Sequence, residues 1–286
     1  MRACLGLAAD TANMLVIEDT GTVLFEADTP HDGSWDAMLK ALAEMARTAN
    51  EAGCTISSAG LVLPDDLSEV PQCEGRDVQR GCQAALGVPV YLASTAQAMA
   101  LAEAKLGAGQ GVELVFGALI TENCAAGVVM DGQLLRGARG LAGQWAHCPL
   151  PWPVPHELDG HSCACGRDGC LNTYISGAGI TAEYYLLTQT EVPAAEVLAR
   201  AQAGDILAES VLQVFEDRLA RATALMINLF DPDMIILGGP LVEMDRMFEN
   251  IPRKWPGYVN GPAPRTQICP AMLGEEAILK GAHFLV

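Results

Sequence analysis

Basic residues are scarce in this chain. Its 286 residues include 17 Lys and Arg against 35 Asp and Glu, which gives a formal net charge of −18 at pH 7. Proteins that bind nucleic acid cluster Lys and Arg against the phosphates, so this balance predicts no nucleic-acid partner. A helix-turn-helix segment is also missing ahead of the first predicted strand, which disfavours a transcriptional repressor.

Long apolar runs are absent too. No segment reaches the roughly eighteen apolar residues of a membrane span, and the N-terminus lacks a basic stretch followed by a cleavage site. We therefore expect no membrane partner and a cytoplasmic location. Apolar residues make up 50% of the chain and charged residues 18%, a balance typical of a folded protein. The length suits one large domain or two small ones.

Cysteine, in contrast, is abundant, and three of the ten cysteines stand within "HSCACGRDGC", residues 161–170. Cys163, Cys165 and Cys170 are separated by short, glycine-containing spacers that let a tight loop aim several sulfurs at one point. That spacing predicts tetrahedral zinc rather than a disulfide, and three thiolates with a histidine would leave no open position for water, as in a structural site. Three upstream histidines could supply the fourth ligand: His147, His156 and His161. His147 follows a glycine-containing turn and is best placed to fold back toward the cysteines.

The order of predicted elements indicates an α/β protein. Strands are expected at 2–8, 13–19, 22–29, 57–64, 88–94, 112–120, 124–135 and 233–239, and helices at 35–52, 76–86, 96–107, 171–187, 194–203 and 207–229. A β-rich start followed by helices occurs twice, with a seam near residues 108–113. We therefore expect two α/β lobes, 1–110 and 111–286, with a ligand cleft between them and a last helix that packs back on the first lobe.

Several segments together resemble one known family. "GQWAHCPLPW" (143–152), "CACGRDGCLNTYISGAGI" (163–180) and "NLFDPDMIILGGPL" (228–241) look like segments of the ROK family (repressors, open reading frames and sugar kinases), closest to its fructokinase and N-acetylglucosamine kinase branch. "MRACLGLAADT" and "LASTAQAMALAEAKLGAG" match other blocks in order and spacing. The resemblance implies a two-lobed actin-like ATPase (ribonuclease H-like) fold, a homodimer, and structural zinc held by His147, Cys163, Cys165 and Cys170.

The nucleotide-side motifs depart from the family pattern. The resemblance implies an Asp and a Gly-Gly-Thr turn after the first strand, but residues 6–10 read Gly-Leu-Ala-Ala-Asp, and a second Gly-Thr-Gly turn reads Thr-Glu-Asn at 121–123. Added carboxylates beside a triphosphate would cost on the order of several kcal/mol, so Mg-ATP binding is doubtful. The residues implied for this nucleotide site are Asp10, Thr121, Glu122, Gly238 and Gly239.

The substrate-side motifs depart as well. At the position of the family's general base stands Thr95, which cannot accept a proton near neutral pH as a carboxylate does, and Gln144 and Asn172 replace two glutamates. The substrate pocket implied by the resemblance comprises Ser94, Thr95, Gln97, Gln144, His147 and Asn172. We therefore predict a catalytically impaired sugar-kinase-like protein that binds a sugar or sugar-acid type molecule. The alternative is an active ATP-dependent hexose kinase.

Overall fold

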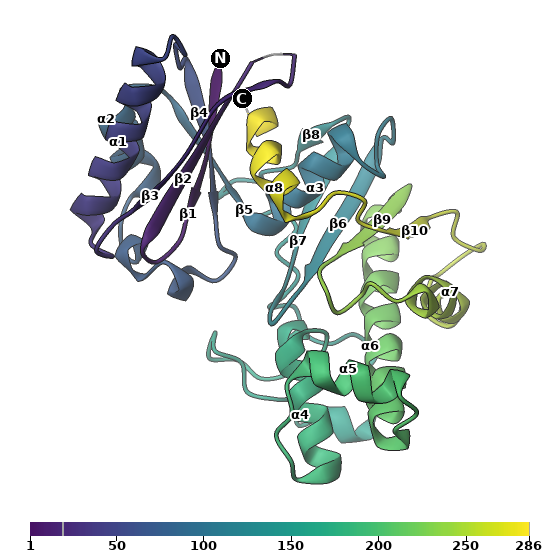
Figure 1. Cartoon of the computed structure of the whole chain (residues 1–286). Coiled ribbons are helices and arrows are strands. Elements are labelled where there is room, and N and C mark those ends of the chain that lie inside the picture. Colours follow the sequence, from purple (N-terminus) through teal and green to yellow (C-terminus); the bar gives the residue numbers. More distant parts are fainter. Residues whose placement is uncertain (19, 286) are drawn as a thin grey trace.

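Two five-stranded mixed sheets form the frame of the molecule, for which a computed structural model describes residues 1–18 and 20–285 (Figure 1). The first sheet has the strand order β3-β2-β1-β4-β5, in which β4 and β5 run parallel to β1 while β2 is antiparallel to both its neighbours. Its strands are β1 (Arg2–Leu7), β2 (Thr11–Ile17), β3 (Val23–Pro30), β4 (Ser58–Leu63) and β5 (Val90–Ser94). Asp19, the last residue of a predicted strand, lies outside the described residues.

The second sheet repeats this plan. Its order is β10-β9-β6-β7-β8, with β6, β9 and β10 parallel and β7 antiparallel to β6 and β8. Its strands are β6 (Leu114–Ile120), β7 (Cys124–Met130), β8 (Gln133–Leu134), β9 (Met234–Gly238) and β10 (Gln267–Pro270). The predicted two-lobed α/β architecture is confirmed.

Helices pack along the first sheet, whereas in the second lobe α4 (Gly177–Thr188), α5 (Ala194–Gln202) and α6 (Ile206–Phe230) form a group that extends beyond the ends of the strands (Figure 1). On the first sheet, α1 (Trp35–Glu51) and α2 (Val78–Leu86) bury an apolar stripe that includes Met38, Leu42 and Met45. α1 begins where the sequence predicts because the Ser34 hydroxyl accepts a hydrogen bond from the Ala37 N–H at 3.2 Å. The second lobe also carries α7 (Asp245–Lys254).

Between the two sheets lie α3 (Thr95–Leu106) and α8 (Glu275–Gly281) (Figure 1). The alanine-rich α3 is almost wholly buried and approaches β6 and β7 closely: a Cβ on Gly117 would stand 2.5 Å from the Ala100 Cβ. Beyond α8, a short 3-10 helix, η6 (Ala282–Leu285), packs against β4 of the first lobe. One buried cluster thus joins both sheets through α3 and the C-terminal segment.

Some elements differ from the sequence prediction. α7 and β10 have no predicted counterpart, since Pro252 interrupts the helical pattern of α7 and β10 is a four-residue edge strand. The helix predicted from residue 171 starts at Gly177, because residues 171–173 form a 3-10 turn and Ser176 caps the helix. Within the described part of the chain, no helix is both long and apolar enough to cross a membrane.

Candidate functional site: a four-donor cluster and an interlobe cleft

The predicted zinc ligands come together. The ligand atoms of His147, Cys163, Cys165 and Cys170 all lie within 4.8 Å of one another. The His147 Nδ1 stands 3.5 Å from the Cys163 Sγ, and the Cys165 Sγ 3.6 Å from that of Cys170. A tight turn produces this convergence: the Cys163 N–H donates to the Arg167 carbonyl at 2.8 Å, and Gly166 adopts a φ of +82° that favours glycine.

The other two candidate histidines lie apart from this cluster. His161 packs against Tyr174, with ring centroids 4.9 Å apart, and His156 is exposed on a 3-10 turn. All ten cysteines are free thiols. The structure therefore places His147, rather than His156 or His161, with the three cysteines.

The donor set fits a divalent cation. Burial, together with the neighbouring Cys165 and Cys163, raises the pKa of the Cys170 thiol to about 12. At the exposed Cys165 the backbone N–H of Arg167 lowers the thiol pKa. Three close thiolates repel one another unless a cation lies among them, and a Cys3His set is a common tetrahedral ligand set for zinc. Such an ion would hold the loop in place and would leave no position for substrate.

A buried ion network ties this cysteine-rich loop to α6. The carboxylate of Glu157 contacts Arg218 at 2.8 Å and Arg221 at 2.8 Å, and Arg218 also contacts Glu183 at 2.7 Å. Burial alone would raise the pKa of Glu157, but hydrogen bonds from Arg221 and Arg218 outweigh it and hold the pKa at about 2. The Arg218 guanidinium also lies 4.8 Å from the ring centroid of Tyr174. The segment that leads into the cysteine-rich loop is therefore held to α6 by buried charges.

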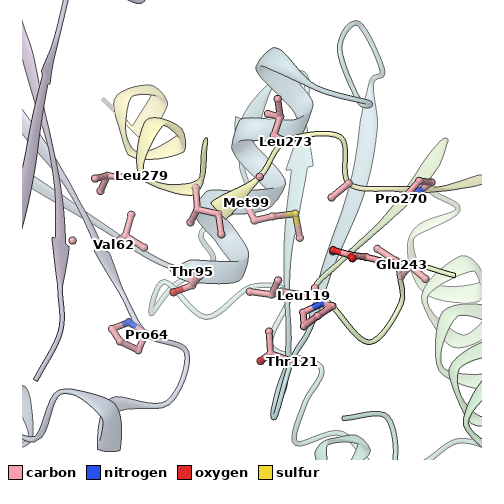
Figure 2. Close-up of a pocket in the computed structure, with 18 of the residues that line it drawn as sticks. Val62, Pro64, Thr95, Met99, Leu119, Thr121, Glu243, Pro270, Leu273 and Leu279 are labelled. Atoms are coloured by element: carbon pink, nitrogen blue, oxygen red, sulfur yellow. The ribbon is translucent and has the colours of Figure 1, made fainter. Parts of the chain in front are cut away.

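A cavity of about 540 Å³ lies between the lobes, at the carboxyl ends of the parallel strands (Figure 2). Its wall is mostly apolar, and among the described residues that line it Glu243 is the only ionisable one. In Figure 2, Pro64 and Thr95 stand on one side of the cavity and Leu119 and Thr121 on the other. Apolar side chains line much of the remaining wall: Val62, Met99, Leu237, Leu273, Ile278 and Leu279.

The predicted nucleotide-side residues separate into two groups. Thr121, Gly238 and Gly239 line the cavity, whereas Asp10 and Glu122 are exposed side chains outside its lining. Packing alone requires glycine at Gly239, because its φ is +101° and a Cβ there would overlap the Ile120 carbonyl. The Glu122 carboxylate instead lies against Gly177 at the start of α4.

At the end of β1, Asn13 occupies the space beside Gly6. The two residues are cross-strand partners in the β1–β2 ladder, and a Cβ on Gly6 would overlap the Asn13 Oδ1 and stand 3.1 Å from its Cγ. The Asn13 Oδ1 is buried and has no hydrogen-bond partner in the described chain. A carboxylate on residue 6 would therefore have to displace the Asn13 side chain.

The predicted substrate residues do not converge on one cavity. Thr95 lines both the large cavity and a smaller neighbour of about 170 Å³, while Gln144 and His147 are exposed and line neither. Ser94 forms a capping box with Gln97 at the start of α3. The amide of Asn172 accepts from the Cys124 N–H at 2.7 Å and donates to Asn123 at 2.9 Å, so it braces the β6–β7 turn. Ligand contacts for these residues stay predictions.

Asp65 is a cleft residue that sequence reasoning missed. It follows β4, lines the smaller cavity, and its Oδ2 accepts a hydrogen bond from the Ala96 N–H at 3.0 Å. Burial raises the pKa of its carboxyl and the charge of Glu69 adds to that rise, while hydrogen bonds from Ser94 and Ala96 oppose it. Its position directly after a buried strand that ends in "LPDD" was the available signal, because such strand ends meet at one sheet edge.

Known proteins resemble this chain over almost its whole length. It is 26% identical over 270 residues to an N-acetyl-D-glucosamine kinase of Yersinia enterocolitica, covering 90% of this chain and 89% of the relative. It is 28% identical over 284 residues to an N-acetylgalactosamine kinase of a Shewanella species, covering 95% and 92%. Among solved structures, the ROK hexokinase of Thermus thermophilus superposes with a TM-score of 0.86 at 29% identity, covering 99% of this chain and 97% of that one.

The family model described as the ROK family matches residues 2–286. The two-lobed actin-like fold implied by the sequence resemblance agrees with the superposition on the Thermus thermophilus structure. With the model spanning nearly every residue and the Cys3His cluster in place, this chain belongs to the ROK family.

Proposed function

We propose that this protein binds a sugar-type small molecule in the interlobe cleft and that its phosphotransfer chemistry is strongly impaired. The observation that carries the impairment of phosphotransfer is the Gly6–Asn13 pair. Magnesium prefers anionic oxygen ligands, and phosphoryl transfer depends on charge stabilisation at the phosphates. At the end of β1, an amide fills the space where a carboxylate on residue 6 would stand.

The rest of the large cavity supports the same proposal. Its described lining contains one ionisable residue, Glu243, whose carboxylate would repel a triphosphate at short range. The turn at 121–123 carries side chains where glycines would allow close backbone approach to phosphate. Mg-ATP binding is therefore expected to be weak. Zinc, in this proposal, is a structural ion in the Cys3His cluster.

Calorimetric titration tests the proposal. Purified protein is titrated with glucose, N-acetyl-D-glucosamine and N-acetyl-D-galactosamine, and separately with Mg-ATP. We expect saturable heat with at least one sugar and much weaker binding of Mg-ATP. No binding by any of the sugars would overturn the sugar-binding part, and tight Mg-ATP binding would overturn the impairment.

The second candidate is an active ATP-dependent sugar kinase. Two observations favour it: the relatives named above are N-acetylhexosamine kinases, and Asp65 provides a carboxylate next to Thr95. In that case Glu243 would have to help hold the metal in the large cavity. Measured ADP formation with Mg-ATP and each sugar separates the two candidates.

Location and assembly complete the proposal. By analogy with the related sugar kinases, we place the protein in the cytoplasm as a homodimer. Light scattering after size-exclusion chromatography tests the dimer, since a monomer at micromolar concentration would contradict it.

A further inference from the structure

The smaller cavity differs in character from the large one beside it. Both share Pro64, Thr95, Leu119 and Thr121, so the two cavities adjoin at the start of α3. The smaller cavity is lined on one side by the segment that follows β4. That segment contributes three carboxylates, Asp65, Asp66 and Glu69, and no described lining residue is basic.

Asp65 is held differently from its two acidic neighbours. Asp66 and Glu69 are exposed, and the Asp66 carboxylate is used locally to cap the Ser68 N–H at 2.9 Å. Asp65 reaches across to α3, where its Oδ2 accepts a hydrogen bond from the Ala96 N–H at 3.0 Å. This contact holds one carboxylate oxygen of Asp65 at the start of α3.

One oxygen of Asp65 is left without a partner. Its Oδ1 is buried and accepts no hydrogen bond from the described chain. An unsatisfied buried acceptor is costly, and a carboxylate oxygen can accept only from a donor. Because this oxygen has almost no exposed surface, a ligand hydroxyl can donate to it only after the Asp65 side chain turns toward the cavity that it lines. The nearby Thr95 hydroxyl is already engaged with the Leu63 carbonyl at 3.2 Å.

The strand register explains why this carboxylate lies beside Thr95. β4 and β5 are parallel, with Leu63 paired to Ser94, so the residues that follow the two strands emerge at the same sheet edge. Asp65 stands two residues beyond Leu63, and Thr95 one residue beyond Ser94. The carboxylate of Asp65, just after β4, thus reaches the N-terminus of α3, where Thr95 itself provides no carboxylate.

We propose that Asp65 is the residue that anchors the ligand in this cleft, by accepting a hydrogen bond from a hydroxyl of a neutral sugar. This inference rests on the proposed function and narrows its ligand class. Sugar acids and sugar phosphates are disfavoured because three carboxylates and no described base line the smaller cavity. Of the two ligand types predicted from the sequence, the neutral sugar is therefore favoured over the sugar acid.

Matched variants test the inference by calorimetry. Asp65→Asn and Asp66→Asn are titrated with N-acetyl-D-glucosamine, its 6-phosphate and glucose, alongside the wild-type protein, and thermal unfolding confirms that each variant is folded. Because hydrogen bonds to charged groups are stronger than neutral ones, Asp65→Asn should weaken binding of the neutral sugar about tenfold or more. Asp66→Asn should change it less than about twofold, because that carboxylate is exposed and used for capping.

A second variant guards against a general folding effect. In Asp65→Ala/Thr95→Asp the carboxylate returns from α3, and binding should recover relative to Asp65→Ala alone. Equal weakening by Asp65→Asn and Asp66→Asn, unchanged binding in Asp65→Asn, or tighter wild-type binding of the 6-phosphate would each overturn this inference alone. Absence of sugar binding by the wild-type protein would overturn the proposed function as well.

Discussion

Substitution of Gly6 probes the altered end of β1. A Cβ there overlaps only the end of the Asn13 side chain, which can rotate at a cost of about 0.5–1.5 kcal/mol. Replacing glycine also lowers the entropy of the unfolded chain, which returns about 0.4–1 kcal/mol. The net cost of Gly6→Ala in the free energy of unfolding should therefore be about 1 kcal/mol or less.

Gly60 on β4 provides the matched comparison. There a Cβ would overlap the Ala282 carbonyl and stand 2.8 Å from its carbon, and backbone cannot rotate away as the Asn13 side chain can. Gly60→Ala should therefore cost about 3 kcal/mol, since relief requires the C-terminal segment to shift. Moreover, Asn13→Ala should reduce the cost of Gly6→Ala but leave that of Gly60→Ala unchanged.

Urea unfolding monitored by circular dichroism measures these differences. We expect Gly60→Ala to be the more destabilising variant, and a coupling of about 1 kcal/mol between positions 6 and 13. Equal costs at the two glycines, or strict additivity between Gly6→Ala and Asn13→Ala, would refute the account of how Asn13 fills this site.

Two further predictions concern the cysteine-rich loop. Purified protein should release one equivalent of zinc to a colorimetric chelator and should then unfold at a lower temperature. Cys170→Ser should abolish zinc binding, while Cys148→Ser, outside the cluster, should retain it. Full zinc content in Cys170→Ser would contradict the ligand set. Glu157→Gln should cost about 3 kcal/mol at pH 7, because it leaves buried arginines short of a counter-charge, whereas Glu196→Gln at an exposed pair should cost under about 1 kcal/mol. The pKa of Glu157 in the folded protein is about 2, against an ordinary 4.5. Its contribution to the free energy of unfolding is therefore present above pH 4.5 and is lost as pH falls toward 2. Acid titration should narrow the difference in unfolding free energy between wild type and Glu157→Gln, and a difference that stays constant would contradict the assignment.

Local features of this fold could be read from the sequence. The start of α1 follows from one side chain, Ser34, and the Cys3His cluster from three cysteines within eight residues. The spacing of the cysteines does not distinguish His147 from His161 as the fourth ligand, because the answer depends on how the chain folds back toward the cysteines. The family resemblance implied His147, and the structure places it there.

Non-local features could not be read in the same way. Asp65 and Ala96 are 31 residues apart, and their contact depends on the parallel register of β4 and β5. Likewise, the resemblance implies a nucleotide-side role for Gly239, and only the structure shows that a Cβ at this position would also overlap the Ile120 carbonyl. Such contacts depend on which strands end next to each other in the sheet. The residue pattern along a single strand does not specify this.

We propose above that the cleft binds a sugar and that its phosphotransfer chemistry is strongly impaired. ADP formation, measured with Mg-ATP and a sugar shown by calorimetry to bind, tests it most directly. The account predicts ADP formation no faster with the sugar than without it. Sugar-dependent turnover at about 1 s⁻¹ or faster, within the usual range of enzymes, would contradict it.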